Sequence, residues 1–371
     1  MVNNDLDGSL TLLLVTKDRE RFLHRWMSYA ESIKLPFKVF IADGGKGTCS
    51  FLNNGSFPSV NYTYRKYPYD KTFSEFYSKV VNALNEINTS FTVWADDDDL
   101  YMINGLRNSL NFLSINPTYN ACRGILGFFN IISSNNKDLL SDVYGNSVKY
   151  NIISKPFNEN ECSVYEDNII KRLNNYLSLK TPTWYDLRRT KDLKYLWTKI
   201  RDYDFNNLLL AECFLDIMTV INGNIKRLSN INNNLYLMRQ TPPPESVART
   251  FREEFGDSFN QMLVDTWSED YKKYTDGIQA FIQEKEQSIS KNEAQEIAKK
   301  SFRSYYANSI IKELSEEKNQ LTRSLKLKSI NSIKFYSKYF KRMHHPFLKK
   351  LVYEKTNLEL NHAVKFLVKN E

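Results

Sequence analysis

The segment FTVWADDDDLYMING, residues 91–105, places four consecutive aspartates directly after a run of apolar residues. The apolar run predicts a buried strand, so residues 96–99 would stand at its carboxyl end. Four adjacent carboxylates repel one another unless cations compensate them. Carboxylate oxygens suit Mg²⁺ or Mn²⁺, and we therefore predict a divalent-metal site here rather than a solvated acidic loop. An EF-hand is excluded because its ligand spacing and terminal Glu are missing.

The first third of the chain alternates strand and helix patterns. Strands are predicted at residues 10–15, 37–42, 60–67 and 90–95, and helices at residues 21–33 and 71–87. This order predicts an α/β sandwich with a mostly parallel sheet. Polar residues follow three of the strands, at residues 16–19, at Asp43 and at residues 96–99. Because such sheets bind ligands at the carboxyl ends of their strands, we expect these groups to share one site.

The remaining pattern is less regular. We predict a helix at 100–116, one strand at 121–133, hairpins and loops at 133–175, helices at 183–196 and 205–222, and a short strand at 232–240. The segment TPPPES, residues 241–246, breaks the pattern. We therefore expect one domain at 1–245, with halves at 1–130 and 131–245, followed by a helical region at 246–371.

Four ordered segments resemble one family. WADDDDL at 94–100 matches the D-x-D element of GT-A glycosyltransferases, and LLLVTKDRERFL at 12–23 and VFIADGG at 39–45 are similar to the first two strands of glycosyltransferase family 2. FSEFYSKVVNAL at 73–84, followed by the aspartates, resembles a bacterial subset with a helical Lys and an A-D-D-D strand end. The resemblance covers roughly residues 9–240. It implies a GT-A fold in which residues 1–130 form the nucleotide-sugar-binding half and residues 131–245 the acceptor-binding half.

The resemblance also implies roles for single residues. Thr16 and Arg19 would line the nucleotide site, and Asp43 would recognise the base. Lys79 would approach the base or the diphosphate, and Arg239 would contact the diphosphate. Among the aspartates, Asp96 and Asp97 would belong to the donor site, and Asp98 with Asp96 would bind the metal. The residues themselves also allow other interpretations. Arg19 could be a surface charge, Asp43 an Asx turn, and Lys79 part of a solvated helix face. The D-x-D register could also be Asp97/Asp99.

A transfer that inverts the sugar carbon needs a general base. The family places an acid about 11 residues before the glycine that ends the same helix, and Glu212 stands at that spacing from Gly223. Asp216 lies one turn later on the same face. We favour Glu212 over Asp216 as the catalytic base, because burial in this apolar run would raise its pKa. The alternative is that both are exposed helix acids.

These features predict a metal-dependent glycosyltransferase that uses Mn²⁺ or Mg²⁺. It would move a sugar, with inversion, from a nucleotide-sugar to a glycan or lipid-linked acceptor in bacterial surface polysaccharide synthesis. A UDP-sugar is the default donor, because the family uses it most often. A nucleotidyltransferase and a non-catalytic helical scaffold with a degenerate transferase domain are the alternatives. The first would usually carry a Gly-rich phosphate loop, which VTKDRERF at 15–22 lacks.

The charge of the chain is concentrated in its tail. Residues 301–371 contain 15 Lys/Arg and 6 Asp/Glu, whereas the other 300 residues contain 36 and 37. An apolar stripe at residues 333–347, flanked by lysines, could pack on the body, mediate a homo-oligomer, or lie on an anionic membrane. The balanced body argues against nucleic acid as a partner. With no signal-like start or spanning segment, we expect a cytoplasmic location, with peripheral binding at the inner membrane face as an option. The four dispersed cysteines predict free thiols rather than zinc ligands.

Overall fold

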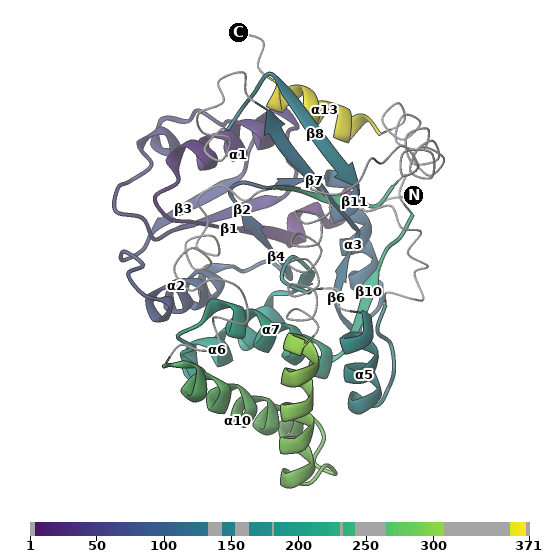
Figure 1. Ribbon diagram of the computed structural model, residues 1–371. Coiled ribbons are helices and arrows are strands. Elements are labelled where there is room, and N and C mark those ends of the chain that lie inside the picture. Colours follow the sequence, from purple (N-terminus) through teal and green to yellow (C-terminus); the bar gives the residue numbers. More distant parts are fainter. Residues whose placement is uncertain are drawn as a thin grey trace, which may run out of the picture.

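The computed structural model describes residues 4–132, 143–152, 163–179, 182–230, 233–241, 265–307 and 357–368. Figure 1 shows a central sheet with helices on both faces, a second sheet beside it, and further helices below. The predicted fold class, an α/β sandwich with a mostly parallel sheet followed by helices, is confirmed.

The larger sheet, sheet A, carries most of the predicted strands. Its order is β10–β6–β9–β4–β1–β2–β3, with bounds β1 Leu10–Thr16, β2 Lys38–Asp43, β3 Tyr62–Lys66, β4 Phe91–Asp96, β6 Tyr119–Arg123, β9 Leu187–Arg189 and β10 Asn224–Arg227. β1 pairs in parallel with β2 and β4, and β9 runs antiparallel between β4 and β6. Thr16 faces Asp43 in the register, and Val15 faces Asp96. The three polar strand ends therefore meet at one edge.

Three helices belong to the first third of the chain: α1 Glu20–Ser32, α2 Phe73–Glu86 and α3 Ile103–Ile115, of which α2 packs on β1 and β2 and α3 packs on β6 and on β11 (Leu235–Gln240). α2 begins with a complete capping box, in which Thr72 and Glu75 satisfy each other's backbone N–H groups. α1 buries the face that contains Phe22, Trp26 and Tyr29, at the spacing that the sequence predicts.

The second half is built around α7, Leu208–Asn222. It packs between α5 (Ile169–Leu179), α6 (Thr190–Tyr203) and α10 (Trp267–Lys285). Its residues are buried on almost every side, which explains an apolar run without helical amphipathicity. The helix ends at Gly223, as predicted.

The smaller sheet, sheet B, places a second strand end beside the aspartates. Its order is β5–β11–β7–β8, with bounds β5 Leu100–Tyr101, β7 Ile125–Ile132, β8 Ser147–Ile152 and β11 Leu235–Gln240. β11 runs parallel to β7 and antiparallel to β5, the short strand that follows the aspartates. This pairing brings the end of β11 next to the aspartate turn.

Four local predictions are wrong. The helix predicted at 100–116 begins at Ile103, because residues 100–101 pair with β11 as β5, and residues 169–175, predicted as hairpins and loops, belong to α5. Residues 121–133 form two strands in different sheets, not one, because the chain changes direction at Gly124. A Cβ atom at Gly124 would meet the carbonyl oxygen of Asn234 at 2.2 Å, so only glycine allows this crossing. Residues 183–196 do not begin as a helix, because residues 187–189 form β9 before α6 starts.

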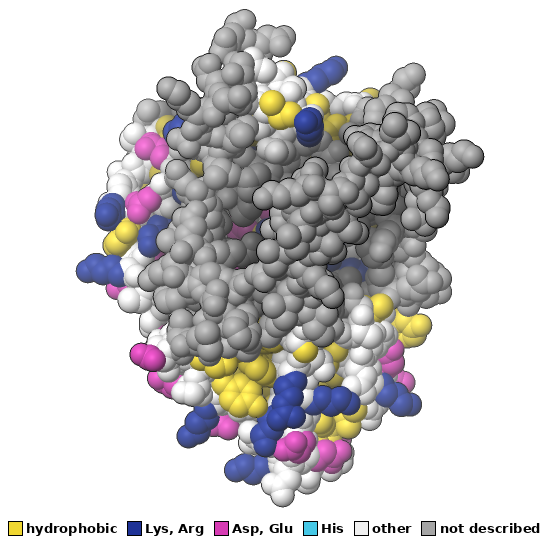
Figure 2. Space-filling model, in the orientation of Figure 1, with side chains coloured by type: hydrophobic (Ala, Val, Ile, Leu, Met, Phe, Trp, Pro, Cys, Tyr) yellow, Lys and Arg dark blue, Asp and Glu magenta, His cyan; other side chains and the backbone are white. Residues whose placement is uncertain are grey.

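The described parts of the C-terminal region are helical and pack on the body. α10 packs on α7 and α6, residues 291–307 form a helix, and α13 (Leu358–Leu367) packs beside β8. The Oγ atom of Ser290 accepts the Glu293 N–H at 3.3 Å at the start of the second of these helices. Within that helix, Glu296 pairs with Lys299 at 2.7 Å. Around α10, Figure 2 shows basic and acidic side chains interspersed.

The basic stripe at residues 333–347 lies outside the described residues, as does most of the predicted boundary at 241–246. The division into domains therefore stays a prediction. Among the helices that are described, none combines the length and apolarity that crossing a membrane requires. Cys49, Cys122 and Cys213 are buried free thiols.

Candidate metal and donor site

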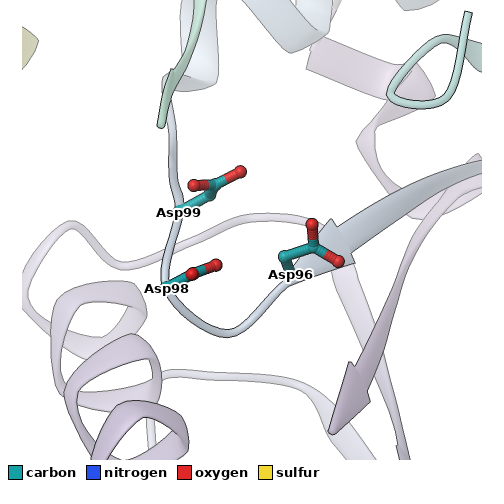
Figure 3. Close-up of side chains that lie close together, drawn as sticks. All are labelled: Asp96, Asp98 and Asp99. Atoms are coloured by element: carbon teal, nitrogen blue, oxygen red, sulfur yellow. The ribbon is translucent and has the colours of Figure 1, made fainter. Parts of the chain in front are cut away.

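Three of the four aspartates gather at the carboxyl end of β4. Figure 3 shows Asp96 at the tip of the strand and Asp98 and Asp99 on the turn that leaves it. One carboxylate oxygen from each residue lies within 4.8 Å of the other two. Opposite ligands of a Mg²⁺ ion are about 4 Å apart, so this spacing needs little adjustment to hold a divalent cation.

Asp97 does not belong to this group. Its Oδ2 atom accepts a hydrogen bond from the Thr16 hydroxyl at 2.6 Å, and its Oδ1 atom lies 2.8 Å from Nη1 of Arg19. Burial raises the pKa of Asp97 to about 6, although Arg19 opposes the shift. The triad of Asp96, Asp98 and Asp99 agrees with the predicted Asp96/Asp98 register and adds Asp99, whose role the sequence left open.

Arg19 joins the first strand end to the aspartate turn. Besides Asp97, it contacts Oδ2 of Asp98 through Nη2 at 3.2 Å. Burial by itself lowers the pKa of Arg19, but the carboxylates of Asp97 and Asp98 outweigh that effect and raise it. The side chain is only 15% exposed, so the surface-charge alternative is wrong.

Arg239 reaches the triad from β11. Its Nε atom lies 3.3 Å from Oδ2 of Asp99, and its guanidinium lies over the ring of Tyr185 at 4.4 Å from the centroid. Among the contacts of the described residues, Nη1 and Nη2 have no partner, and the side chain is 35% exposed. Several N–H donors of Arg239 are therefore available to an anionic ligand beside the triad.

Asp96 is held by two aromatic donors. Trp94 donates its indole N–H to Oδ1 at 2.7 Å, and Tyr185 donates its hydroxyl to Oδ2 at 2.5 Å. Burial and the nearby Asp98 raise the pKa of Asp96, while these hydrogen bonds oppose the shift. Each oxygen retains a lone pair, because a carboxylate oxygen can accept more than one bond.

A fully buried arginine, Arg25, forms a hydrogen bond to the backbone of the aspartate turn. Arg25 of α1 donates to the Asp98 carbonyl oxygen at 2.7 Å, to Oε1 of Gln240 at 2.8 Å and to the Val143 carbonyl oxygen at 3.1 Å. Gln240 in turn donates its backbone N–H to Asp99 at 3.0 Å. Burial lowers the pKa of Arg25 to about 10. This network ties α1, the aspartate turn and the end of β11 together.

Asp43 stands at the neighbouring end of β2, as predicted. Its Oδ1 atom accepts the Gly45 N–H at 2.7 Å, which is the Asx turn of the alternative interpretation. Its Oδ2 atom accepts the Tyr64 hydroxyl at 2.7 Å and lies 3.3 Å from Nζ of Lys66. Both oxygens have protein partners, so base recognition by Asp43 stays a prediction.

Lys79 is buried behind the same edge of the sheet, so the solvated-face alternative is wrong. It pairs with the carboxylate of Asp70 and donates to the Thr16 carbonyl oxygen at 3.2 Å. Burial lowers the pKa of Lys79, while Asp70 opposes the shift. Asp70 packs against Gly44, where a Cβ atom would meet its carboxylate at 2.2 Å. In this conformation Lys79 connects the end of β1 at Thr16 to the loop that contains Asp70. A direct contact between Lys79 and the nucleotide-sugar stays a prediction.

The two candidate bases on α7 have different surroundings. Asp216 is buried and accepts hydrogen bonds from the Thr183 N–H at 2.8 Å, the Thr183 hydroxyl at 2.7 Å, the Tyr176 hydroxyl at 2.7 Å and the Tyr305 hydroxyl at 3.3 Å. Its carboxylate is thus occupied by protein donors. Glu212 is half-buried on the same helix. The exposed-acid alternative is wrong for Asp216.

Charge and geometry both fit a divalent cation. Four carboxylates at positions 96–99 meet three guanidinium groups, those of Arg19, Arg25 and Arg239, which leaves one negative charge in excess. A bound divalent cation would make the net charge of this group positive, and a diphosphate bound beside it would make the net charge negative again. Burial and Asp98 raise the pKa of Asp99 well above its ordinary range, as expected for crowded acids without a cation.

Three supporting residues were not predicted. Trp94 lies within the strand that the sequence identifies, but the apolar pattern does not indicate that its indole N–H donates to Asp96. Arg25 follows Phe22 by three and precedes Tyr29 by four, so its position on the apolar face of α1 was a usable signal. Tyr185 has no such signal, because it meets Asp96 across 89 residues.

Comparisons with known proteins add little. No protein-family model matches the chain, and no curated protein sequence matches it. Solved structures of S. aureus TarS are similar. TarS 1–349 is 12% identical with a TM-score of 0.41, and the comparison covers 80% of this chain and 89% of that one.

Two further structures contain the same TarS fragment with ligands. The complex with UDP is 13% identical with a TM-score of 0.42, and the complex with UDP-GlcNAc is 14% identical with a TM-score of 0.40. Each comparison covers 80% of this chain and 89% of the TarS chain. At this level of similarity, we base the functional proposal on the side chains of this chain alone.

Proposed function

We propose that this chain is a metal-dependent glycosyltransferase of the GT-A type, related to family 2, that uses a nucleotide-sugar donor. The observation that carries the proposal is the triad of Asp96, Asp98 and Asp99 at a strand end, with the partly exposed guanidinium of Arg239 beside it. A carboxylate-bound cation next to an arginine is suited to a diphosphate. The parallel strand ends on either side supply Thr16, Arg19 and Asp43.

Asp96, Asp98 and Asp99 would hold Mn²⁺ or Mg²⁺. When bound, such an ion supplies Lewis-acid stabilisation of a phosphate leaving group. Hard oxygen ligands suit either ion, and because Mg²⁺ prefers six ligands, three carboxylates would leave coordination positions for phosphate oxygens and water.

Arg239 would stabilise the negative charge that develops on the departing nucleoside diphosphate. Its guanidinium plane is fixed by Tyr185 and Asp99, so little reorganisation is needed when a phosphate binds. Removing one such preorganised donor typically costs about 10²–10³ in kcat. A UDP-sugar is the donor to test first.

Glu212 would accept the proton of the acceptor hydroxyl as that oxygen attacks the sugar carbon, giving inversion. The support for choosing it is its spacing of 11 residues from Gly223, the residue that ends α7, and the buried position of Asp216, whose carboxylate is held by four hydrogen bonds from the protein. The acceptor, a glycan or lipid-linked sugar of bacterial surface polysaccharide synthesis, is part of the proposal, as is cytoplasmic action at the inner membrane face.

A thermal-shift panel tests the proposal. The purified chain is melted with nucleoside mono-, di- and triphosphates, with and without Mn²⁺ or Mg²⁺, and we expect UDP plus Mn²⁺ to raise Tm most. Asp98→Ala should abolish the Mn²⁺-dependent part of the shift. Asp202→Ala, which removes a surface carboxylate of α6 that pairs with Arg201, is the matched control and should keep it.

Other outcomes separate the alternatives. A shift with nucleoside triphosphates that exceeds the shift with diphosphates would favour a nucleotidyltransferase. The absence of a shift with every nucleotide, in the presence of Mn²⁺ or Mg²⁺, would favour a scaffold protein. If a shift occurs, turnover of UDP-sugars by wild type and Glu212→Gln then tests the transfer itself.

A further inference from the structure

One side chain contacts both the acidic and the basic part of the candidate site. The hydroxyl of Tyr185 donates to Oδ2 of Asp96 at 2.5 Å, and its ring lies under the guanidinium of Arg239 at 4.4 Å. The side chain is buried. A displacement of Tyr185 would therefore alter a carboxylate of the triad and the neighbouring arginine at once.

The loop that carries Tyr185 is anchored on both sides. Its carbonyl oxygen accepts the Tyr236 hydroxyl of β11 at 2.9 Å. The next residue, Asp186, is buried and pairs with Arg123 at 3.0 Å and with Arg227 at 2.8 Å, at the ends of β6 and β10. The ring of Tyr185 is thus fixed relative to the sheet and provides a rigid reference for the residues it touches.

The effect on Asp96 follows from its two donors. Trp94 holds one carboxylate oxygen and Tyr185 holds the other, which fixes the rotation of the carboxylate plane. Hydrogen bonds to a ligating carboxylate orient it and tune the metal affinity of the site. Without the Tyr185 hydroxyl, Asp96 would retain only the Trp94 restraint.

The effect on Arg239 comes from the ring. A guanidinium over an aromatic face is attracted by the ring quadrupole, and this attraction grows where water is excluded. The stacking on Tyr185 restrains the guanidinium plane while Nε contacts Asp99, and the side chain stays 35% exposed. The ring, not the hydroxyl, provides this restraint.

We propose that Tyr185 is a positioning residue with two separable roles, which rest on the proposed function. Its hydroxyl sets the affinity of the aspartate triad for the divalent cation through Asp96. Its ring sets the affinity for the diphosphate of the nucleotide through Arg239. The two roles make different predictions for a variant that loses the hydroxyl and for one that loses the ring.

The experiment compares Tyr185→Phe and Tyr185→Leu with the wild type in two titrations. Free Mn²⁺ is measured by electron paramagnetic resonance in the presence of UDP, and UDP binding is measured by calorimetry in the presence of EDTA. Tyr195→Phe is the matched control, because Tyr195 also donates its hydroxyl to a carboxylate, that of Glu284, on the surface between α6 and α10. Circular dichroism confirms that each variant is folded.

Tyr185→Phe should weaken Mn²⁺ binding by about tenfold or more and leave UDP binding in EDTA within about twofold of wild type. Tyr185→Leu should weaken both, with UDP binding in EDTA reduced by about threefold to fivefold. Tyr195→Phe should change neither. If Tyr185→Leu does not fold, the Phe variant alone still decides the role of the hydroxyl.

Unchanged Mn²⁺ binding in Tyr185→Phe would overturn the inference, as would an equal loss of Mn²⁺ and metal-free UDP binding in that variant. Both results leave the proposed function intact, because the wild type would still bind UDP and Mn²⁺. A wild type that binds neither would overturn the proposed function itself, and with it the role of Tyr185.

Discussion

Nη2 of Arg25 donates a hydrogen bond to the backbone carbonyl oxygen of Asp98 at 2.7 Å. A fully buried cation of α1 therefore holds the turn that presents the metal-binding carboxylates. The same guanidinium reaches Gln240 at the end of β11. The conformation of the aspartate turn is thus set by a helix and by a strand that come from distant parts of the sequence.

Replacing Arg25 by lysine should loosen this arrangement. A lysine keeps the charge, but its single nitrogen cannot reach three acceptors in a planar fork, and at least one carbonyl or amide oxygen loses its partner. We expect the free energy of unfolding to fall by about 1–3 kcal/mol, measured by urea denaturation. Arg21→Lys, an exposed position on the same helix, should change it by less than about 0.5 kcal/mol. Equal midpoints for the two variants would contradict this role of Arg25.

Asp97 and Asp99 should respond differently to conversion to asparagine. Asp99 belongs to the triad, so Asp99→Asn should weaken Mn²⁺ binding by at least about tenfold. Asp97 pairs with Arg19 and Thr16 instead, so Asp97→Asn should mainly lower the free energy of unfolding, by about 1–3 kcal/mol. Calorimetry with Mn²⁺ and urea denaturation provide the two readouts. A larger loss of Mn²⁺ binding in Asp97→Asn would support the Asp97/Asp99 register.

The sequence was sufficient for the elements that are long and periodic. β1, α1, β2, β3, α2 and β4 occur where the apolar patterns place them, and their parallel pairing brings Thr16, Asp43 and Asp96 to one edge. Strand polarity alone predicts this meeting of strand ends. The prediction of the site from three strand ends therefore depended on local patterns and on one general rule of sheet topology.

The parts that were not predicted depend on long-range contacts. The break at Gly124 sends two adjacent strands into different sheets, because the backbone of Asn234 passes too close for any side chain. The separation of Asp97 from its three neighbours depends on Arg19 and Thr16, and the support of Asp96 depends on Tyr185. Neither periodicity nor a D-x-D spacing contains this information.

The two acids of α7 should be distinguished by their variants. Glu212→Gln should reduce transfer by about 10²-fold or more with little change in unfolding, because a positioned general base contributes about 10²–10⁴-fold. Asp216→Asn should lower the free energy of unfolding by about 1–3 kcal/mol, because its amide nitrogen replaces one of the two acceptor oxygens and cannot accept either the Thr183 bonds or the Tyr176 bond. The readouts are turnover of a UDP-sugar and urea denaturation. Full activity in a folded Glu212→Gln protein would remove Glu212 as the base.

The contact between α13 and α3 should depend on pH through Glu359. Its carboxylate accepts the backbone N–H of Asn104 at 3.2 Å, near Arg107, and burial raises the pKa of Glu359. A raised pKa in the folded state means that the stabilising contribution is complete below the ordinary pKa of glutamate and is lost as pH rises through the raised value.

Melting of wild type and Glu359→Gln between pH 4.5 and pH 7 measures this contribution. The Tm of wild type minus that of Glu359→Gln should become more positive as the pH falls, since the glutamine does not titrate. The sign follows because the folded state binds the proton more tightly than the unfolded state does. A difference that is constant over this range, or that grows toward pH 7, would contradict the assignment to Glu359.

The docking of α13 on sheet B should depend on Leu360 rather than on its neighbour Leu358. Leu360 is 1% exposed and belongs to the apolar cluster with Tyr29 and Ile131, whereas Leu358 is 80% exposed. Leu360→Ala should lower the free energy of unfolding by about 2–5 kcal/mol through lost burial and an incompletely filled cavity. Leu358→Ala removes the same atoms from the same helix and should cost less than about 0.5 kcal/mol. Urea denaturation of both variants tests the contact, and similar losses for the two would show that α13 does not pack on sheet B through this face.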